Sequence, residues 1–154
     1  HPVAHSFPTR RSSDLAGYVF TGKVLSEFFF IGIPCGILTA LILFVNEFPD
    51  CKPDKDAGKY NLVFRLGIQK AFYGVIVIET LFYGSVIAGV FLEILPMISI
   101  TVLLFIPANV LILKRLYQKL PEATEIKNVQ KQIIISYNLR IVFLILTMLF
   151  SLIY

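Results

Sequence analysis

The chain has 154 residues, of which 56% are hydrophobic and 16% charged, with a formal net charge of +4 and a mean hydropathy of +0.78. Soluble globular domains are about 45–50% apolar and about 25% charged, so this composition indicates a membrane protein. Both histidines, His1 and His5, precede residue 6. This excludes a histidine-dependent catalytic triad or a histidine-ligated zinc site in the rest of the chain, and we expect the lipid bilayer, not nucleic acid, as the macromolecular surroundings.

The first fifteen residues differ from everything that follows. The run "SFPTRRSSDL" (6–15) coincides with an in-frame translation of a widely used sequencing-library adapter, so we interpret residues 1–15 as a processing scar and expect the natural N-terminal part to be missing. The alternative is a native basic tail. The next run, Ala16–Gly22, is predicted to be the last turns of an earlier helix.

Four apolar segments are long enough to cross a bilayer, which takes about 20 residues in a helix. They predict helices over about residues 25–46, 68–92, 94–113 and 133–154. Inside lipid every backbone N–H and C=O group needs a local partner, and these runs lack the alternating pattern of barrel strands. The sequence therefore predicts an all-α membrane protein, a multi-pass bundle of transmembrane helices.

Lysine and arginine gather in two of the predicted connections, at 46–67 and at 114–132. On the other side only Lys23 precedes the first span, and the turn at Glu93–Pro96 has no basic residue. By the positive-inside rule both basic connections face the cytoplasm. The polar segment 119–132 is predicted to be either a short surface helix, starting after Leu120-Pro121, or a solvated connector.

The connection at 46–67 carries the candidate chemistry. Asn46, Asp50 and Asp54 are spaced by four, so on a helix they would share one face, about one turn apart. Their oxygen atoms suit Mg²⁺, which binds a few carboxylates together with waters and substrate phosphates. Lys59 and Arg65 follow, and both side chains can bind phosphate oxygens. The alternative is a solvated, topology-setting loop.

The order of these residues resembles a known motif. The pattern D-x3-D-x3-G-K, preceded by N-E-x-P and followed by N-L-V-x-R-L-G, occupies "NEFPDCKPDKDAGKYNLVFRLG" (46–67). It is similar to the second aspartate-rich motif of the UbiA superfamily of intramembrane prenyltransferases, and looks most like that of the 1,4-dihydroxy-2-naphthoate polyprenyltransferases of menaquinone biosynthesis. Pro53 departs from the family pattern and is expected to interrupt a helix there.

The resemblance implies a nine-helix prenyltransferase fold in a cell membrane, of which residues 16–154 would be the C-terminal part. It implies that Asp50 and Asp54 bind Mg²⁺ as catalytic residues, that Asn46, Lys59 and Arg65 contact the substrate, and that Asp56 is variable. The substrates would be a polyprenyl diphosphate and an aromatic acceptor. Because the first aspartate-rich motif of the family is absent from this sequence, the 154-residue chain alone is expected to be inactive.

Several alternatives remain open at this stage. Within the family, the acceptor could be 4-hydroxybenzoate, haem, chlorophyllide or a glycerol phosphate lipid. From another class, the chain could be a transporter or a non-catalytic membrane subunit whose acidic segment binds a cation.

Two single side chains and the two cysteines carry further predictions. Glu79 lies inside a predicted span, where it would bind an acceptor hydroxyl or be satisfied by a Thr or Tyr of a neighbouring helix. Arg140 is predicted to extend toward the cytoplasmic face. Cys35 and Cys51 are predicted to be reduced and structural.

Overall fold

The computed structural model describes residues 26–120 and 123–153. Within these ranges every regular element is helical, which confirms the predicted all-α fold. The elements are α2 (Ser26–Asp56), α3 (Leu62–Leu66), α4 (Ile68–Phe91), the 3₁₀ helix η1 (Met97–Phe105), α5 (Ile106–Lys119) and α6 (Ala123–Ile153). The predictions for residues 1–15 and Ala16–Gly22 lie outside the described residues.

Four segments of the described helices are long and apolar enough to cross a membrane. They are Gly32–Cys51 in α2, Ile68–Phe91 in α4, Met97–Lys119 over η1 and α5, and Ile126–Phe150 in α6. Each overlaps one of the four apolar runs read from the sequence. The prediction of a multi-pass helix bundle is therefore confirmed.

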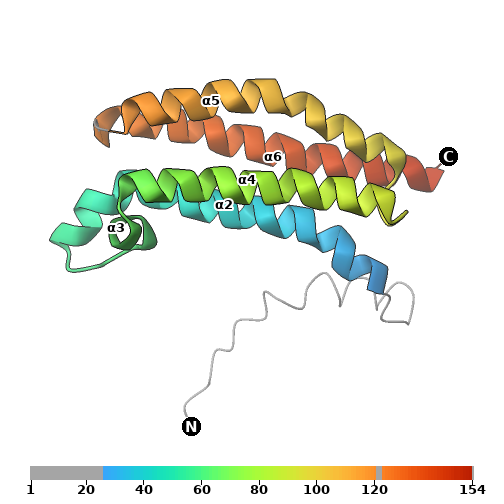
Figure 1. Ribbon diagram of the computed structural model, residues 1–154, viewed down its shortest axis with the longest axis horizontal. Coiled ribbons are helices and arrows are strands. Elements are labelled where there is room, and N and C mark those ends of the chain that lie inside the picture. Colours follow the sequence, from blue (N-terminus) through green and yellow to red (C-terminus); the bar gives the residue numbers. More distant parts are fainter. Residues whose placement is uncertain (1–25, 121–122, 154) are drawn as a thin grey trace, which may run out of the picture.

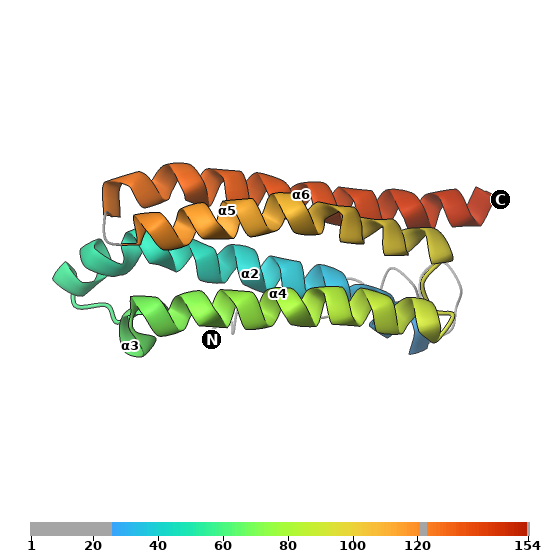
Figure 2. The same ribbon diagram turned by 45° about the horizontal axis from the view of Figure 1, so that its top comes forward.

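The four long helices lie side by side as a bundle (Figure 1). α2 packs against both α4 and α6, and α5 packs against α6 (Figure 2). The core is built from side chains that are 0% exposed, among them Leu41 and Val45 of α2, Val75 and Phe82 of α4, and Ile133 and Tyr137 of α6. Apolar side chains also cover much of the outer surface, as expected for helices that face lipid.

Both basic connections lie at the same end of the bundle. Figures 1 and 2 show α3, the end of α2, the end of α5 and the start of α6 at that end, while the turn from α4 to η1 and the end of α6 lie at the other. The alternation inferred from the lysine and arginine counts is therefore reproduced.

α2 continues well beyond the predicted end near residue 46. It runs as one helix to Asp56, through Pro49 and Pro53, so the predicted interruption at Pro53 was wrong. A proline in a helix removes one N–H donor and leaves one carbonyl without its partner. Pro53 is exposed and lies in the last turn of α2, so it removes only one bond close to the end of the helix.

The helix ends at a glycine. Gly58 has φ of +73°, its N–H donates to the Lys55 carbonyl at 3.0 Å, and the Lys59 N–H donates to the Asp54 carbonyl at 2.7 Å. This pair of bonds around a left-handed residue is a Schellman cap, for which glycine is the favoured residue. The Gly-Lys step of the motif is therefore the physical stop of α2, which turns the chain back toward α3.

The last two spans also differ from the predicted boundaries. The third starts as a 3₁₀ helix at Met97 and extends to Lys119, beyond the predicted end at 113. α6 begins at Ala123 rather than near 133, so the segment predicted as a separate surface helix or a connector is the first part of one continuous helix. Residues 123–132 contain neither Gly nor Pro, so nothing in them stops the helix.

A tight turn joins α4 to η1. Glu93 has φ of +59°, and the N–H groups of Ile94 and Leu95 both donate to the Gly89 carbonyl at 2.9 Å. A methyl group placed on Gly89 would lie 2.6 Å from Cδ1 and 2.9 Å from Cγ of Leu95. Because Leu95 is 5% exposed, its side chain has little room to move, and the turn depends on the absence of a side chain at Gly89.

Candidate functional site

The acidic residues of the motif lie on the last turns of α2. Asn46, Asp50 and Asp54 are all part of this one helix, so each follows the one before by about 6 Å along the axis, on the same side. Asp50 is exposed, and Asn46 and Asp54 are half-buried. The structure therefore brings these three predicted residues onto a shared face, at the end of the bundle that carries the basic segments (Figure 1).

Their hydrogen bonds differ. Asn46 Oδ1 accepts from Nε2 of Gln130 on α6 at 2.7 Å, which ties α2 to α6. Asp54 Oδ2 accepts from Nδ2 of Asn61 at 3.2 Å. Asp50 makes no hydrogen bond or ion pair with the part of the chain that the structure describes. Asp50 is thus the carboxylate with both oxygens open to a ligand.

The two basic candidates follow the turn at Gly58. Lys59 lies in the link between α2 and α3, and Arg65 lies on α3, which packs against both α2 and α4. Both side chains are exposed. The fold places them at the same end of the bundle as Asp50 and Asp54, as a diphosphate site would require.

Two residues that the sequence left without a role connect α2 to α3. Glu47 Oε2 accepts from the backbone N–H of Leu62 at 2.7 Å and of Val63 at 3.2 Å. Asn61 Oδ1 accepts from the Phe64 N–H at 2.8 Å, and its Nδ2 also donates to the Glu47 carbonyl at 3.1 Å. An asparagine before a short apolar run is a helix-start signal, so the role of Asn61 could have been predicted.

An apolar groove of about 530 Å³ lies beside this end of α2. It is formed by α2, α3 and α4 and is lined by Ala40, Leu43, Phe44, Glu47, Leu62, Leu66, Gly74, Val77 and Ile78. Glu47 is its one acidic lining residue, and it lies one turn before Asp50. A hydrocarbon chain in the groove would thus have its polar end near the aspartates.

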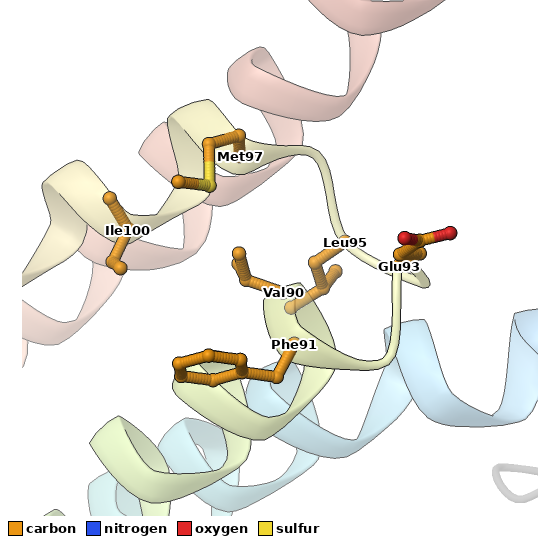
Figure 3. Close-up of a pocket in the computed structure, with 6 residues that line it drawn as sticks. All are labelled: Val90, Phe91, Glu93, Leu95, Met97 and Ile100. Atoms are coloured by element: carbon orange, nitrogen blue, oxygen red, sulfur yellow. The ribbon is translucent and has the colours of Figure 1, made fainter.

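A second hollow, of about 450 Å³, lies at the turn between α4 and η1. Figure 3 shows its lining, in which the Glu93 carboxylate points away from the apolar side chains of Val90, Phe91 and Leu95. The turn from α4 to η1 that forms this hollow lies at the end of the bundle opposite α3 (Figure 1). A single carboxylate directed outward offers no chemistry for a ligand inside it.

The donors at the aspartate end suit an incomplete magnesium site. Over residues 26–120 and 123–153, no three His, Cys, Asp or Glu side chains converge as a metal cage. Two carboxylates one turn apart, one of them fully available, are a donor set that Mg²⁺ accepts when waters and substrate phosphates supply the other ligands. The residues present therefore fit a metal shared with a phosphate ester.

Arg140 and Glu79 form an ion pair inside the bundle. Arg140 is 0% exposed and Glu79 is 4% exposed, and Nη1 donates to Oε2 at 2.9 Å. The Nη2 atom donates to Asn109 Oδ1 at 2.7 Å and to Ser136 Oγ at 3.1 Å. The prediction that Arg140 extends toward the cytoplasmic face was wrong, because buried acceptors from α4, α5 and α6 bind both Nη atoms inside the bundle.

This pairing also answers the question about Glu79. Its ion-pair partner is the Arg140 guanidinium, and the Tyr137 side chain of the neighbouring helix α6 also interacts with its carboxylate. Enclosure among helices makes Glu79 part of the packing between α4 and α6. Cys35 and Cys51 are both free thiols, in agreement with the prediction.

Comparison with known protein families gives a match over most of the chain. A family model described as the UbiA prenyltransferase family matches residues 15–136. The matched range contains Asn46, Asp50, Asp54, Lys59 and Arg65. No curated protein and no solved structure matches the chain.

Proposed function

The chain belongs to the UbiA prenyltransferase family, and we propose that it serves the transfer of a polyprenyl group from polyprenyl diphosphate to an aromatic acceptor. The family supports prenyl transfer in a membrane; the acceptor that we propose is 1,4-dihydroxy-2-naphthoate, in menaquinone biosynthesis. The observation that carries the proposal is the placement of Asp50 and Asp54 on one face of α2, beside an apolar groove and at the same end as Lys59 and Arg65.

In this proposal Asp50 and Asp54 are the residues that would hold Mg²⁺ at the diphosphate of the donor. The metal would supply neutralisation of the negative charge that develops on the leaving group. Arg65 and Lys59 add positive charge near the same oxygens, and Arg65 can bind two of them at once. These side chains favour the state in which the diphosphate departs, because its charge is then greatest.

The reaction follows from that departure. The allylic C–O bond breaks and its electron pair leaves with the diphosphate, so an allylic cation remains. The electron-rich ring of the acceptor attacks the cation and forms the new C–C bond. For dihydroxynaphthoate, the ring carboxylate at that carbon leaves as CO₂, and the electron pair of the broken bond restores the aromatic ring.

The groove between α2, α3 and α4 suits the hydrocarbon part of the donor. Apart from Glu47 its lining is apolar, so it favours a hydrocarbon chain over the water that would quench an allylic cation. Glu47 stands where the apolar lining meets the aspartates. The polar head and the apolar tail of one polyprenyl diphosphate thus each have a matching surface.

Other acceptors define the alternatives within the family, namely 4-hydroxybenzoate, haem, chlorophyllide and a glycerol phosphate lipid. Assays of the full-length protein with each acceptor distinguish them. A non-catalytic membrane protein that binds a cation at the same residues is the alternative from a different class.

The test uses Asp50→Asn and Asp54→Asn in membranes that contain the full-length protein. Each substitution removes a charge from the proposed metal site, so we expect prenyl transfer to fall by at least about 100-fold. Removal of Mg²⁺ by a chelator should have the same effect.

Asp56→Asn is the matched control, since Asp56 is an exposed acid on the same helix to which we assign no ligand role. It should keep near-normal activity. Unchanged prenyl transfer in Asp50→Asn and Asp54→Asn would favour the non-catalytic alternative.

A further inference from the structure

α3 has only five residues, too few to form a stable helix alone. The first N–H groups of any helix lack partners within it. Here Leu62, Val63 and Phe64 are the first three residues, and each of their N–H groups has an acceptor in a side chain, either Glu47 Oε2 or Asn61 Oδ1. The start of α3 is therefore fixed by two side chains, which we call the α2–α3 clamp (Glu47 and Asn61).

The clamp also touches the aspartate face directly. The Asn61 amide group that accepts from Phe64 through its oxygen donates through its nitrogen to Asp54 Oδ2, at 3.2 Å, and to the Glu47 carbonyl, at 3.1 Å. One side chain thus caps α3 and holds one oxygen of Asp54. The other Asp54 oxygen remains available to a ligand.

Glu47 shares the aspartate side of the helix, since it precedes Asp50 by three residues and Asp54 by seven. One of its oxygens is nevertheless committed to two backbone amides of α3. Such bonds between a carboxylate and N–H groups at a helix start are charge-assisted and favoured by the helix dipole. Glu47 therefore fixes the position of α3, and with it that of Arg65.

From these contacts we propose that Glu47 and Asn61 are positioning residues of the diphosphate site. Asn61 orients the Asp54 carboxylate, and Glu47 holds α3 so that Arg65 faces the same ligand as the two aspartates. The inference rests on the proposed function, because it concerns how the acidic and basic residues of that site are held in position relative to one another.

The first experiment compares Asn61→Ser with Asn61→Ala in the full-length protein. Serine is a good helix N-cap, but its hydroxyl lies one bond closer to the backbone than the amide nitrogen and does not reach Asp54. Hydrogen exchange of the metal-free protein should show Phe64 protected in Asn61→Ser and exchanging at least about 10-fold faster in Asn61→Ala.

Binding of inorganic pyrophosphate in the presence of Mg²⁺, measured by calorimetry, is the second readout. We expect Asn61→Ser to raise the Mg²⁺ concentration needed for binding by about 10-fold or more, the usual effect of losing a partner of a metal ligand. Asn128→Ala, at an exposed asparagine of α6, is the control and should bind as the unmodified protein does. Equal Mg²⁺ requirements in Asn61→Ser and the unmodified protein would overturn the role of Asn61.

The role of Glu47 is tested by a double-mutant cycle with Arg65. If Glu47 acts by placing Arg65, Glu47→Ala and Arg65→Ala should each weaken pyrophosphate binding, and the double variant should bind no worse than Arg65→Ala. Glu47→Gln, which keeps an acceptor oxygen, should recover part of the loss. Fully additive effects would show that Glu47 does not act through Arg65 and would overturn this half of the proposal.

The failure of this inference and that of the proposed function give different results. If pyrophosphate does not bind in a manner that depends on Asp50, the proposed function fails. If Asp50-dependent binding is present but is unaffected by Asn61→Ser and Glu47→Ala, only the positioning role fails. Glu93→Gln, in the turn between α4 and η1, controls for loss of one carboxylate.

Discussion

Arg140 and Glu79 form a buried ion pair that couples two helices of an apolar bundle. Each charge alone would be costly among lipid-facing helices, and each is made tolerable by the other together with Asn109 and Ser136. The guanidinium also lies 4.9 Å from the centre of the Tyr137 ring, a cation–π contact. The ion pair therefore joins α4 to α6, and the packing of these two helices depends on it.

We predict that Arg140→Met destabilises the protein by about 3–5 kcal/mol, because it leaves Glu79 buried without its partner. Thermal unfolding in detergent measures this. The double variant Glu79→Leu with Arg140→Met removes both charges and should regain most of the stability. A double variant as unstable as the single one would show that the ion pair is not the source of the effect.

Some of these residue contacts could be predicted and others could not. The spacing of Asn46, Asp50 and Asp54 was sufficient to predict one helical face, because that relation is local. The bonds from Glu47 to Leu62 and Val63 cross 15 and 16 residues of sequence, and the bond from Arg140 to Glu79 crosses 61. Contacts at such separations depend on how the helices pack, which spacing alone does not encode.

Among the elements, α4 contains two glycines whose surroundings differ. Gly84 and Gly89 lie in the same helix, five residues apart. A methyl group on Gly84 would meet nothing within 4 Å, whereas one on Gly89 would press on the buried Leu95. The two positions form a matched pair within one helix.

We predict that Gly89→Ala destabilises the protein by about 1–3 kcal/mol through overpacking against Leu95. Gly84→Ala should instead be neutral or stabilising by about 0.5–1 kcal/mol, because alanine loses less conformational entropy in a helix. Unfolding midpoints of the two variants provide the measurement. Equal effects at both positions would contradict the packing argument.

The four membrane-spanning helices were predicted well, but the residues at which the helices begin and end were predicted poorly. The four apolar runs were sufficient to locate the spans, since hydropathy alone decides which segments enter the bilayer. The end of α2 was placed about ten residues too early because the polar residues after Val45 were read as a loop. The physical stop is the left-handed Gly58, and polarity by itself does not end a helix that projects into solvent.

At the scale of the whole molecule, the bundle places its two basic segments at one end. We propose that this end faces the cytoplasm in the cell membrane, as the excess of lysine and arginine favours. The aspartate face of α2 would then meet a substrate delivered from the cytoplasmic side.

The prediction is tested by labelling single cysteines with a membrane-impermeant thiol reagent in a background where Cys35 and Cys51 are replaced by serine. Lys59→Cys and Lys114→Cys should react only when the reagent reaches the cytoplasmic face. Glu93→Cys should react only from the other side. Labelling of Lys59→Cys and Lys114→Cys from opposite faces would refute the arrangement.

The continuity of α2 has a consequence for the surrounding lipid. Its apolar part, Gly32–Cys51, is about 30 Å long at 1.5 Å per residue, close to the thickness of a hydrocarbon core. Asp50 thus stands at the boundary of that core and Asp54 about 6 Å farther out. Because α2 runs as one helix from this apolar part to its acidic end, the height of both carboxylates depends on how the helix sits in the bilayer. In a thinner membrane both carboxylates would lie farther from the level of the lipid headgroups. Membrane thickness would therefore affect how well these carboxylates reach the diphosphate group of an isoprenoid substrate.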